Sequence, residues 1–231
     1  MKILAIIPAR GGSKGVPRKN IKLLGNMPLI EYTINAAKAS TELTEIVVST
    51  EDAEIAIAAE VCGCKPPFIR PAELSEDAAT SISVVQHAIA FYEKQNVSFD
   101  AVCLLQPTTP FRAKGFIDQA IHKFKASGAD SLVSVLPIPH EYNPHWAFEE
   151  GPSGLLQIAT GESQIIPRRQ ELPKAFHRDG SIYLTKTEIA KAGSFYGKSI
   201  AYIESDADCY VNIDTMKDWE KAERLVHHFN G

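Results

Sequence analysis

The sequence is poor in several features that mark specialised classes of protein. Its first apolar run, residues 3–7, is far too short for a signal peptide or a membrane-spanning helix. There are four cysteines, and Cys62 and Cys64 are separated by one residue, which excludes a zinc ribbon or a redox CxxC motif there. We therefore expect free thiols in a reducing, cytoplasmic setting and no membrane partner.

Positive charge is scarce over the chain as a whole. The formal net charge is −4 at pH 7, and charged residues make up 23% of the sequence. A protein that coats nucleic acid or an anionic membrane needs an excess of lysine and arginine. This balance argues against a nucleic-acid partner, and any ligand of a local basic segment is expected to be small.

Apolar runs alternate with segments that have helical spacing. The predicted strands are 3–7, 45–50, 100–110, 130–138, 181–186 and 199–205, and the predicted helices are 29–40, 52–63, 81–95, 114–128, 187–193 and 215–229. Continuously apolar strands separated by helices indicate an α/β fold with a mostly parallel sheet flanked by helices. Ligands of such sheets bind beyond the carboxyl ends of the strands.

Residues 139–178 interrupt this alternation. They contain several prolines and glycines and two short amphipathic pieces, and they are too long and too apolar for a flexible linker. We interpret the segment as an arm that packs on something, with a second subunit as one option. The 231 residues otherwise fit one domain over 1–231 that includes this arm.

The segment GGSKGVPRKN, residues 11–20, follows the first strand and is rich in glycine and positive charge. Glycine lets successive backbone N–H groups approach an anion, and the cations of Arg10, Lys14 and Lys19 favour a triphosphate. The order of residues is not that of a Walker A loop. A solvated basic turn is the alternative, but the position after a buried strand favours phosphate binding.

A set of motifs in this sequence resembles those of the acylneuraminate cytidylyltransferases, the CMP-sialic acid synthetase family. The motifs are IPARGGSKGVPRKN (7–20), RPAEL (70–74), DAATSIS (77–83), LLQPTTPFR (104–112), PRRQELP (167–173), DGSIY (179–183) and NIDT (212–215). They span nearly the whole chain in the family's order. The resemblance implies a Rossmann-like nucleotidyltransferase fold, similar to the glycosyltransferase-A fold, with a dimerisation arm and a homodimeric state.

The resemblance also implies the reaction and the residues that carry it. CTP and a nonulosonic acid would give a CMP-sugar and pyrophosphate. By this resemblance Arg10 and Lys19 contact the phosphates and act in catalysis with Asp214. The remaining nucleotide-binding residues would be Gly11, Gly12, Ser13, Lys14, Asn20, Arg70, Ala79 and Ser81. A cation and backbone groups would suit the amino and carbonyl groups of cytosine.

Four residues are predicted to contact the sugar. By resemblance Gln106 binds the polyol, and its amide can both donate and accept hydrogen bonds. Arg169 would match the carboxylate of an ulosonic acid with its planar fork, and Arg178 or Asp179 would face the acceptor. The alternatives are a turn-capping role for Gln106 and a surface role for the Arg168–Arg169 pair.

A divalent cation, Mg²⁺, is expected from the reaction, because developing charge on the phosphates must be neutralised. Asn212 and Asp214 are two residues apart, so on an extended segment both side chains face one ion. Family members often have Asp-Ile-Asp where this chain has Asn-Ile-Asp, so we expect weaker metal binding here. A helix N-cap role is the alternative for Asp214.

Two functional alternatives stay open at this point. The same chemistry could act on legionaminic, pseudaminic or deaminated neuraminic acid, or on Kdo, without a change in the CTP motifs. A catalytically silent CTP- or sugar-binding protein is also compatible with Asn212. A nucleic-acid binder is disfavoured, because the basic segment has no neighbouring aromatic residues for base stacking.

Overall fold

The computed structural model describes residues 1–229, and for residues 227–229 it describes the backbone only. The α-helices are α1 (Leu29–Lys38), α2 (Ala53–Val61), α3 (Ser81–Glu93), α4 (Phe116–Ser127), α5 (Thr187–Lys191) and α6 (Met216–Phe229). The strands are β1 (Ile3–Pro8), β2 (Leu23–Leu24), β3 (Met27–Pro28), β4 (Glu45–Ser49), β5 (Ala101–Leu104), β6 (Ser131–Pro137), β7 (Phe148–Glu150), β8 (Leu156–Ile158), β9 (Phe176–Lys186) and β10 (Ile200–Glu204). The expectation that His227 and His228 complement the end of the last helix lies outside the described side chains.

The central sheet has six strands in the order β10-β6-β9-β5-β1-β4. The pairs β1–β4, β1–β5 and β6–β10 are parallel, and β9 runs antiparallel to both of its neighbours, β5 and β6. The predicted mostly parallel sheet flanked by helices is therefore confirmed. Continuous burial of β1 and β5 matches their unbroken apolar sequences, as expected for parallel strands covered on both faces.

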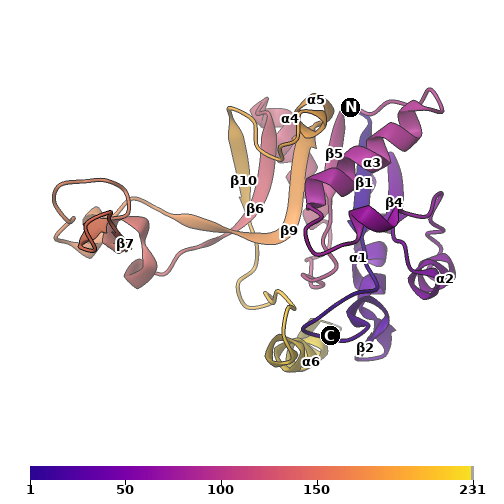
Figure 1. The fold of residues 1–231 in the computed structure, drawn as a ribbon, viewed down its shortest axis with the longest axis horizontal. Coiled ribbons are helices and arrows are strands. Elements are labelled where there is room, and N and C mark those ends of the chain that lie inside the picture. Colours follow the sequence, from indigo (N-terminus) through magenta and orange to yellow (C-terminus); the bar gives the residue numbers. More distant parts are fainter. Residues whose placement is uncertain (230–231) are drawn as a thin grey trace.

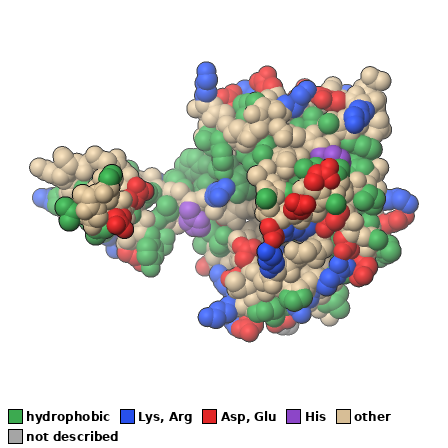
Figure 2. Space-filling model, in the orientation of Figure 1, with side chains coloured by type: hydrophobic (Ala, Val, Ile, Leu, Met, Phe, Trp, Pro, Cys, Tyr) green, Lys and Arg blue, Asp and Glu red, His purple; other side chains and the backbone are tan. Residues whose placement is uncertain are grey.

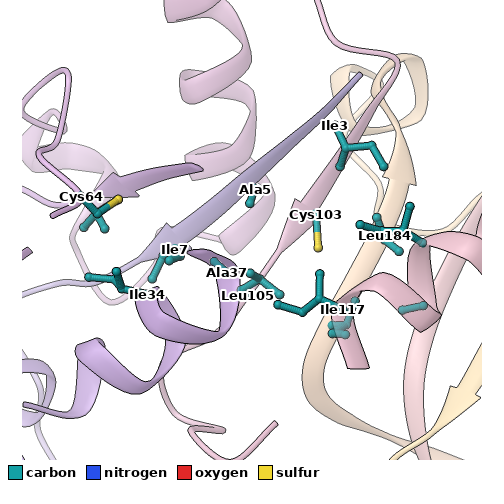
Figure 3. Close-up of a cluster of buried hydrophobic side chains, with 14 of the residues drawn as sticks. Ile3, Ala5, Ile7, Ile34, Ala37, Cys64, Cys103, Leu105, Ile117 and Leu184 are labelled. Atoms are coloured by element: carbon teal, nitrogen blue, oxygen red, sulfur yellow. The ribbon is translucent and has the colours of Figure 1, made fainter. Parts of the chain in front are cut away.

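The core lies in two layers, one on each face of the sheet. Ile3, Ala5 and Ile7 of β1 pack against α1, α2 and α4, as the close-up of this cluster shows (Figure 3). Leu4 and Ile6 of the same strand face the opposite way and pack with residues of α3 and α5. The alternation follows from the two-residue period of a strand, which allows one apolar run to fill both layers.

A third apolar cluster lies under the basic segment 10–19, which we call the basic loop. Val16, in the middle of this loop, is completely buried and belongs to one cluster with Val211, Ile213 and Trp219 of the chain's C-terminal part. Burial of a valine is worth roughly 1.5–3 kcal/mol. The cluster therefore holds the basic loop against residues from the other end of the chain.

The predicted arm is a distinct projection. The segment between β6 and β9 leaves the body on these two strands and ends in a small lobe that contains the hairpin β7–β8 (Figure 1). Several patches of hydrophobic side chains lie on the surface of this lobe (Figure 2), and Phe148, Leu155 and Leu156 are more than half exposed. The function of the arm in dimerisation stays a prediction.

Two predicted boundaries differ from the structure by more than two residues. The strand expected at 181–186 begins at Phe176, because its first residues continue the ladder with β6 beyond a bulge between Val133 and Val135. The strand expected at 100–110 ends at Leu104, because Pro107 and Pro110 cannot donate to a ladder.

Among the helices of the described residues, none is long and apolar enough to cross a membrane.

Candidate active site

The loops at the carboxyl edge of the sheet enclose an open cleft with a cavity volume of about 380 Å³. We call it the main cleft. Acidic and basic side chains lie side by side in the middle of this face of the body (Figure 2). The predicted residues that line the main cleft are Arg10, Ser13, Lys14, Lys19, Asn20, Arg70, Ala79, Ser81, Gln106 and Asp214. Gly11 and Gly12 belong to the same loop but do not line the cleft.

Two consecutive carboxylates after β4 fix the two ends of the basic loop. Glu51 Oε1 accepts a hydrogen bond from the backbone N–H of Gly11 at 2.8 Å. Asp52 pairs with the guanidinium of Arg18, whose Nη2 lies 3.1 Å from Asp52 Oδ1. Arg18 is a further cation of the basic loop, but it does not line the cleft. Its hydrogen bond keeps the pKa of Asp52 below the ordinary value, and burial opposes this shift.

Gly15 and Lys19 connect the basic loop to the segment before α6. A methyl group at Gly15 would overlap the carbonyl oxygen of Asp214, so only glycine permits this approach. Lys19 Nζ donates to the carbonyl of Ile213 at 2.6 Å and lies 3.4 Å from Asp214 Oδ1. Burial lowers the pKa of Lys19, and the nearby Asp214 opposes this effect.

The outer part of the basic loop is neutralised by one carboxylate. Arg10 Nη1 lies 3.1 Å from Asp77 Oδ1, and Lys14 forms an ion pair with the other oxygen of Asp77. The hydrogen bonds from Lys14 and Arg10 keep the pKa of Asp77 below its usual range. Two cations gathered around one anion at the mouth of the cleft are a suitable arrangement for binding a phosphate group.

Arg70 is almost completely buried at the wall of the main cleft. Its Nε donates to Ser75 Oγ at 2.9 Å and its Nη2 donates to Glu51 Oε2 at 2.7 Å. Ala79 and Ser81 lie on the same wall, where α3 begins after the cap Thr80. Since a helix N-terminus carries partial positive charge, this wall combines a cation with backbone donors.

Asn20 has a loop-building contact in addition to its place on the cleft. It is buried, and its Nδ2 donates to the carbonyl oxygen of Arg10 at 2.9 Å. This hydrogen bond joins Arg10, at the start of the basic loop, to Asn20, directly after its end. Asn20 lines the main cleft, as the sequence predicted, and its amide nitrogen is already engaged within the loop.

Gln106 lies where the main cleft meets a second hollow, which we call the side cavity. The side cavity has a volume of about 320 Å³ and is lined by Thr80, Ser81, Gln106, Arg178, Tyr183 and Tyr196, among others. The side-chain amide of Gln106 makes no hydrogen bond to residues 1–229, so it is not used as a turn cap. Arg178 donates to the hydroxyl of Tyr196 at 3.4 Å.

Asp179 and Arg169 occupy other places. Asp179 points to the opposite face of β9 from Arg178, as strand alternation requires. Its buried carboxylate accepts from Ser134, Ser205 and the backbone N–H of Ser181, and it lines neither the main cleft nor the side cavity. The same carboxylate lines a third cavity of about 210 Å³ together with Ser181 and Ser205, so a contact of Asp179 with the acceptor stays a prediction.

Arg169 begins a single 3-10 turn, Arg169–Glu171, in the arm. The arm projects away from the body, and Arg169 lines neither hollow of its own chain (Figure 1). Arg168 beside it pairs with Glu171 at 3.5 Å on the surface. Within one chain, Arg169 therefore does not meet Gln106, another predicted sugar-binding residue, at either hollow.

Asn212 and Asp214 do face the same side, as their spacing predicted. Asn212 Nδ2 donates to Asp214 Oδ2 at 2.7 Å, and both residues are exposed, although only Asp214 lines the main cleft. The N-cap of α6 is Thr215, which exchanges hydrogen bonds with Asp218 in a capping-box arrangement. Asp214 is therefore not the helix cap, and its carboxylate is accessible to a ligand.

The described residues contain no cluster of three or more histidine, cysteine or acidic side chains that would form a protein-only metal site. Asp214 and the amide oxygen of Asn212 supply two hard oxygen ligands. Mg²⁺ usually takes one or two protein oxygens and completes its octahedron with phosphate oxygens and water. The residues therefore fit a magnesium ion that is shared with a phosphate ligand.

Sequence reasoning missed the acidic residues of the site. Glu51, Asp52 and Asp77 hold the basic loop and Arg70, yet none was singled out. The signal was weak, since Glu51 and Asp52 directly follow a strand and precede a helix, where an acidic residue commonly serves as a helix cap. Asp52 does cap α2, with hydrogen bonds from the backbone of Glu54 and Ile55, and the same carboxylate also holds Arg18.

A mostly parallel sheet with a glycine-rich, cationic cleft at its carboxyl edge defines an α/β nucleotide-binding protein. The comparisons with known proteins name the family. The model of the cytidylyltransferase family matches residues 4–228, so the chain belongs to this family. A solved structure of a CMP:2-keto-3-deoxy-manno-octonic acid synthetase, complexed with CTP, shares the fold with a TM-score of 0.73, 17% identity and coverage of 99% of each chain.

Curated relatives resemble the chain more closely in sequence. The pseudaminic acid cytidylyltransferase of Campylobacter jejuni is 37% identical over 99% of this chain and 98% of that protein. The CMP-N,N'-diacetyllegionaminic acid synthase of Legionella pneumophila is 37% identical over 98% of this chain and 97% of that protein. The N-acylneuraminate cytidylyltransferase A of Danio rerio is 33% identical over 98% of this chain, which spans 51% of that protein.

Proposed function

We propose that this cytidylyltransferase transfers CMP from CTP to the anomeric 2-hydroxyl of a nonulosonic acid and releases pyrophosphate. One observation carries the proposal: the cationic main cleft meets the side cavity at Gln106, so a nucleotide and an acceptor can lie end to end. Relatives that act on pseudaminic, legionaminic and neuraminic acids support the class of acceptor.

The basic loop has the composition and the anchoring that bind a triphosphate. Arg10 and Lys14 would exchange Asp77 for phosphate oxygens, and Lys19 would stabilise charge that develops as pyrophosphate leaves. Lys19 is already held in place by the carbonyl of Ile213, so it needs little reorganisation during the reaction. Ser13 and Asn20 complete the nucleotide side of the main cleft.

Arg70, Ala79 and Ser81 form the wall that we assign to the cytosine base. Arg70 Nη1 makes no hydrogen bond to residues 1–229, and the backbone at the start of α3 lies next to it on the cleft. Arginine only donates, so it suits the carbonyl oxygen and the ring nitrogen acceptor of cytosine. The base would then lie across the cleft from the basic loop.

The acceptor would occupy the side cavity next to Gln106. The free amide of Gln106 can both donate to and accept from sugar hydroxyls, and Arg178 places positive charge on the same hollow. An ulosonic acid carries a carboxylate, which an arginine binds well through two parallel hydrogen bonds. Binding both substrates in one geometry provides the orientation that in-line attack on the α-phosphorus requires.

We further propose a homodimer in which the arm of each copy reaches the site of the other. Arg169 lines neither hollow of its own chain, while the arm exposes Phe148, Leu155 and Leu156. Exposed apolar patches of this kind are typical of subunit contacts. In such a dimer Arg169 would contact the acceptor carboxylate from across the interface.

Mg²⁺ would supply charge neutralisation on the phosphate oxygens when bound. Asp214 and Asn212 would hold it together with the triphosphate. Replacing Asn212 by Asp adds one negative charge to the pair, so we expect Asn212→Asp to lower the Mg²⁺ concentration that gives half-maximal activity by about threefold to tenfold. A titration of pyrophosphate release against Mg²⁺ measures this, and a loss of activity instead would show that the amide of Asn212 is required.

The direct test is pyrophosphate release with CTP and Mg²⁺ over a panel of pseudaminic, legionaminic, N-acetylneuraminic and deaminated neuraminic acids and Kdo. Release with one acid supports the proposal and identifies the acceptor. If no acid gives release while CTP still binds, the proposal is wrong and the silent binding protein is favoured. A matched reaction with UTP in place of CTP controls for unspecific hydrolysis.

A further inference from the structure

Glu51 contacts both walls of the nucleotide side of the cleft, the basic loop and the wall that contains Arg70. Its Oε1 accepts from the N–H of Gly11 at 2.8 Å, at the start of the basic loop. Its Oε2 accepts from Arg70 Nη2 at 2.7 Å and from Ser75 Oγ at 2.9 Å, on the opposite wall. One carboxylate therefore joins the loop that meets phosphate to the guanidinium that meets the base.

The geometry leaves Arg70 little freedom. Its side chain is 3% exposed, and two of its three nitrogens are engaged by Glu51 and Ser75. The two partners also bond to each other, so the three groups form a closed ring of hydrogen bonds. Partial burial acts to raise the pKa of Glu51, but the hydrogen bonds from Gly11 and Arg70 outweigh this effect and lower the pKa. The carboxylate therefore stays charged at neutral pH.

We propose that Glu51 is a positioning residue that sets the base selectivity of the enzyme by fixing Arg70 relative to the basic loop. The inference rests on the proposed function, since it assumes that CTP lies in the main cleft with its base at Arg70. Glu51 itself does not line the cleft. It acts through Arg70 on the base and through Gly11 on the phosphates.

Fixing Arg70 matters because cytosine and uracil differ at the ring nitrogen between their two exocyclic groups. This nitrogen accepts a hydrogen bond in cytosine and donates one in uracil. A guanidinium can only donate, so a fixed guanidinium aimed at this edge bonds to cytosine and opposes the N–H of uracil. A loosened guanidinium can turn toward either carbonyl oxygen of uracil, which lowers the penalty for the wrong base.

The test compares CTP and UTP in wild-type protein and in Glu51→Gln. The amide oxygen of the substituted side chain can still accept from Gly11, but its NH₂ group would meet the donor Nη2 of Arg70. We expect the ratio of kcat/KM for CTP to that for UTP to fall by about tenfold or more, mainly through the KM for CTP. Glu54→Gln is the matched control, since Glu54 pairs with Arg18 and touches neither Arg70 nor Gly11, and its ratio should stay within about twofold.

A double-mutant cycle with Arg70→Lys tests whether Glu51 acts through Arg70. If it does, adding Glu51→Gln to Arg70→Lys has almost no further effect on the CTP:UTP ratio, because the two changes remove one unit. Independent, additive effects on the ratio would overturn the proposal. An unchanged ratio in Glu51→Gln alone would overturn it as well.

Two further measurements keep the test decisive. Ser75→Ala removes the third member of the ring and is a milder change, so it replaces Glu51→Gln if that variant does not fold. We expect a smaller fall in the CTP:UTP ratio of kcat/KM, and no fall refutes the proposal. Calorimetric binding of CTP and UTP needs no acceptor acid. If wild-type protein releases no pyrophosphate with any acid, the proposed function fails, while the binding ratio still decides the role of Glu51.

Discussion

The basic loop and the arm both carry arginines in proline- and glycine-containing sequence, yet the structure treats them differently. In the loop, Arg10 pairs with Asp77 and Arg18 pairs with Asp52. In the arm, Arg168 has only an exposed partner, Glu171, and the side chain of Arg169 forms no hydrogen bond or ion pair within residues 1–229. Similar composition therefore gives a loop whose arginines are held by carboxylates that are distant in the sequence and an arm whose arginines stay at the surface.

The difference follows from what surrounds each segment. The basic loop has a buried anchor, Val16, and two carboxylates from the residues after β4, so burial and ion pairs act together. The hairpin β7–β8 of the arm is short and mostly exposed, and a lone two-stranded hairpin is only marginally stable in water. The basic loop is thus anchored to the body of the protein, whereas the hairpin of the arm has few buried contacts of its own.

The largest effect that would test this comparison is expected from Lys19→Met. The side chain of Lys19 is largely enclosed between the loop and Ile213, so its charge is shielded from solvent at the cleft. We expect kcat/KM for CTP to fall about a hundredfold or more. Lys22→Met is the control, because Lys22 faces Trp219 outside the cleft. Steady-state pyrophosphate release measures both, and equal effects would contradict the assignment of Lys19.

Glycine substitutions test the preparation of the loop itself. Gly15→Ala places a methyl group against the backbone of Asp214, whereas Gly12→Ala meets no atom within 4 Å. Overpacking of this kind costs roughly 1–3 kcal/mol, and a displaced loop that loses this much transition-state binding lowers kcat/KM about fivefold to 150-fold in Gly15→Ala. Gly12→Ala should stay within about twofold. Similar losses in the two variants would show that the loop is not held by its contact with Asp214.

The arm is tested by replacing its two arginines separately. We expect Arg169→Ala to raise the KM for the acceptor acid about tenfold and to leave the KM for CTP unchanged, because a bidentate bond to the carboxylate is lost. Arg168→Ala is the matched control and should change neither value by more than about twofold, as its partner Glu171 is exposed. A rise in the KM for CTP in Arg169→Ala would place that residue elsewhere in the mechanism.

The smallest effect concerns stability and pH. Arg18 holds the pKa of Asp52 below its ordinary value, so this pair stabilises the fold above that value, and the stabilisation is lost as the pH falls through the folded-state pKa. Asn also caps helices well, so Asp52→Asn should cost about 1 kcal/mol at pH 7 through the ion pair alone. Urea unfolding should show this difference shrinking below about pH 4. A difference that persists unchanged as the pH falls through the folded-state pKa would show that charge is not its cause.

The local elements were largely predictable from the sequence. Strong periodicity and unbroken apolar runs located β1, β4, β6 and every α-helix, since those signals depend on neighbours in the chain. The grouping of Arg10, Gln106 and Asp214 at one cleft followed from the rule for parallel sheets and is confirmed in the structure. The placement of Asn212 beside Asp214 was also predicted correctly from spacing alone.

Other features depended on partners that are distant in the chain. The early start of β9 required β6 as a neighbour, and the burial of Asp179 required Ser134 and Ser205. No local pattern in the sequence shows which of several cavities a buried carboxylate faces. The sequence predicted Asp179 on the acceptor side of the site, and the structure places it among serines on a cavity separate from the main cleft and the side cavity.

By itself, the sequence determined an α/β protein with a cationic, glycine-rich loop at the carboxyl edge of its sheet, because periodicity and residue chemistry are local properties. Only the tertiary structure decided that Glu51 joins Gly11 to Arg70 and that the arm's Arg169 stays apart from both hollows of its own chain. The physical reason is that hydrogen bonds and ion pairs act over a few ångströms. Their partners are therefore fixed by how the chain folds back on itself, whatever the separation of the residues along it.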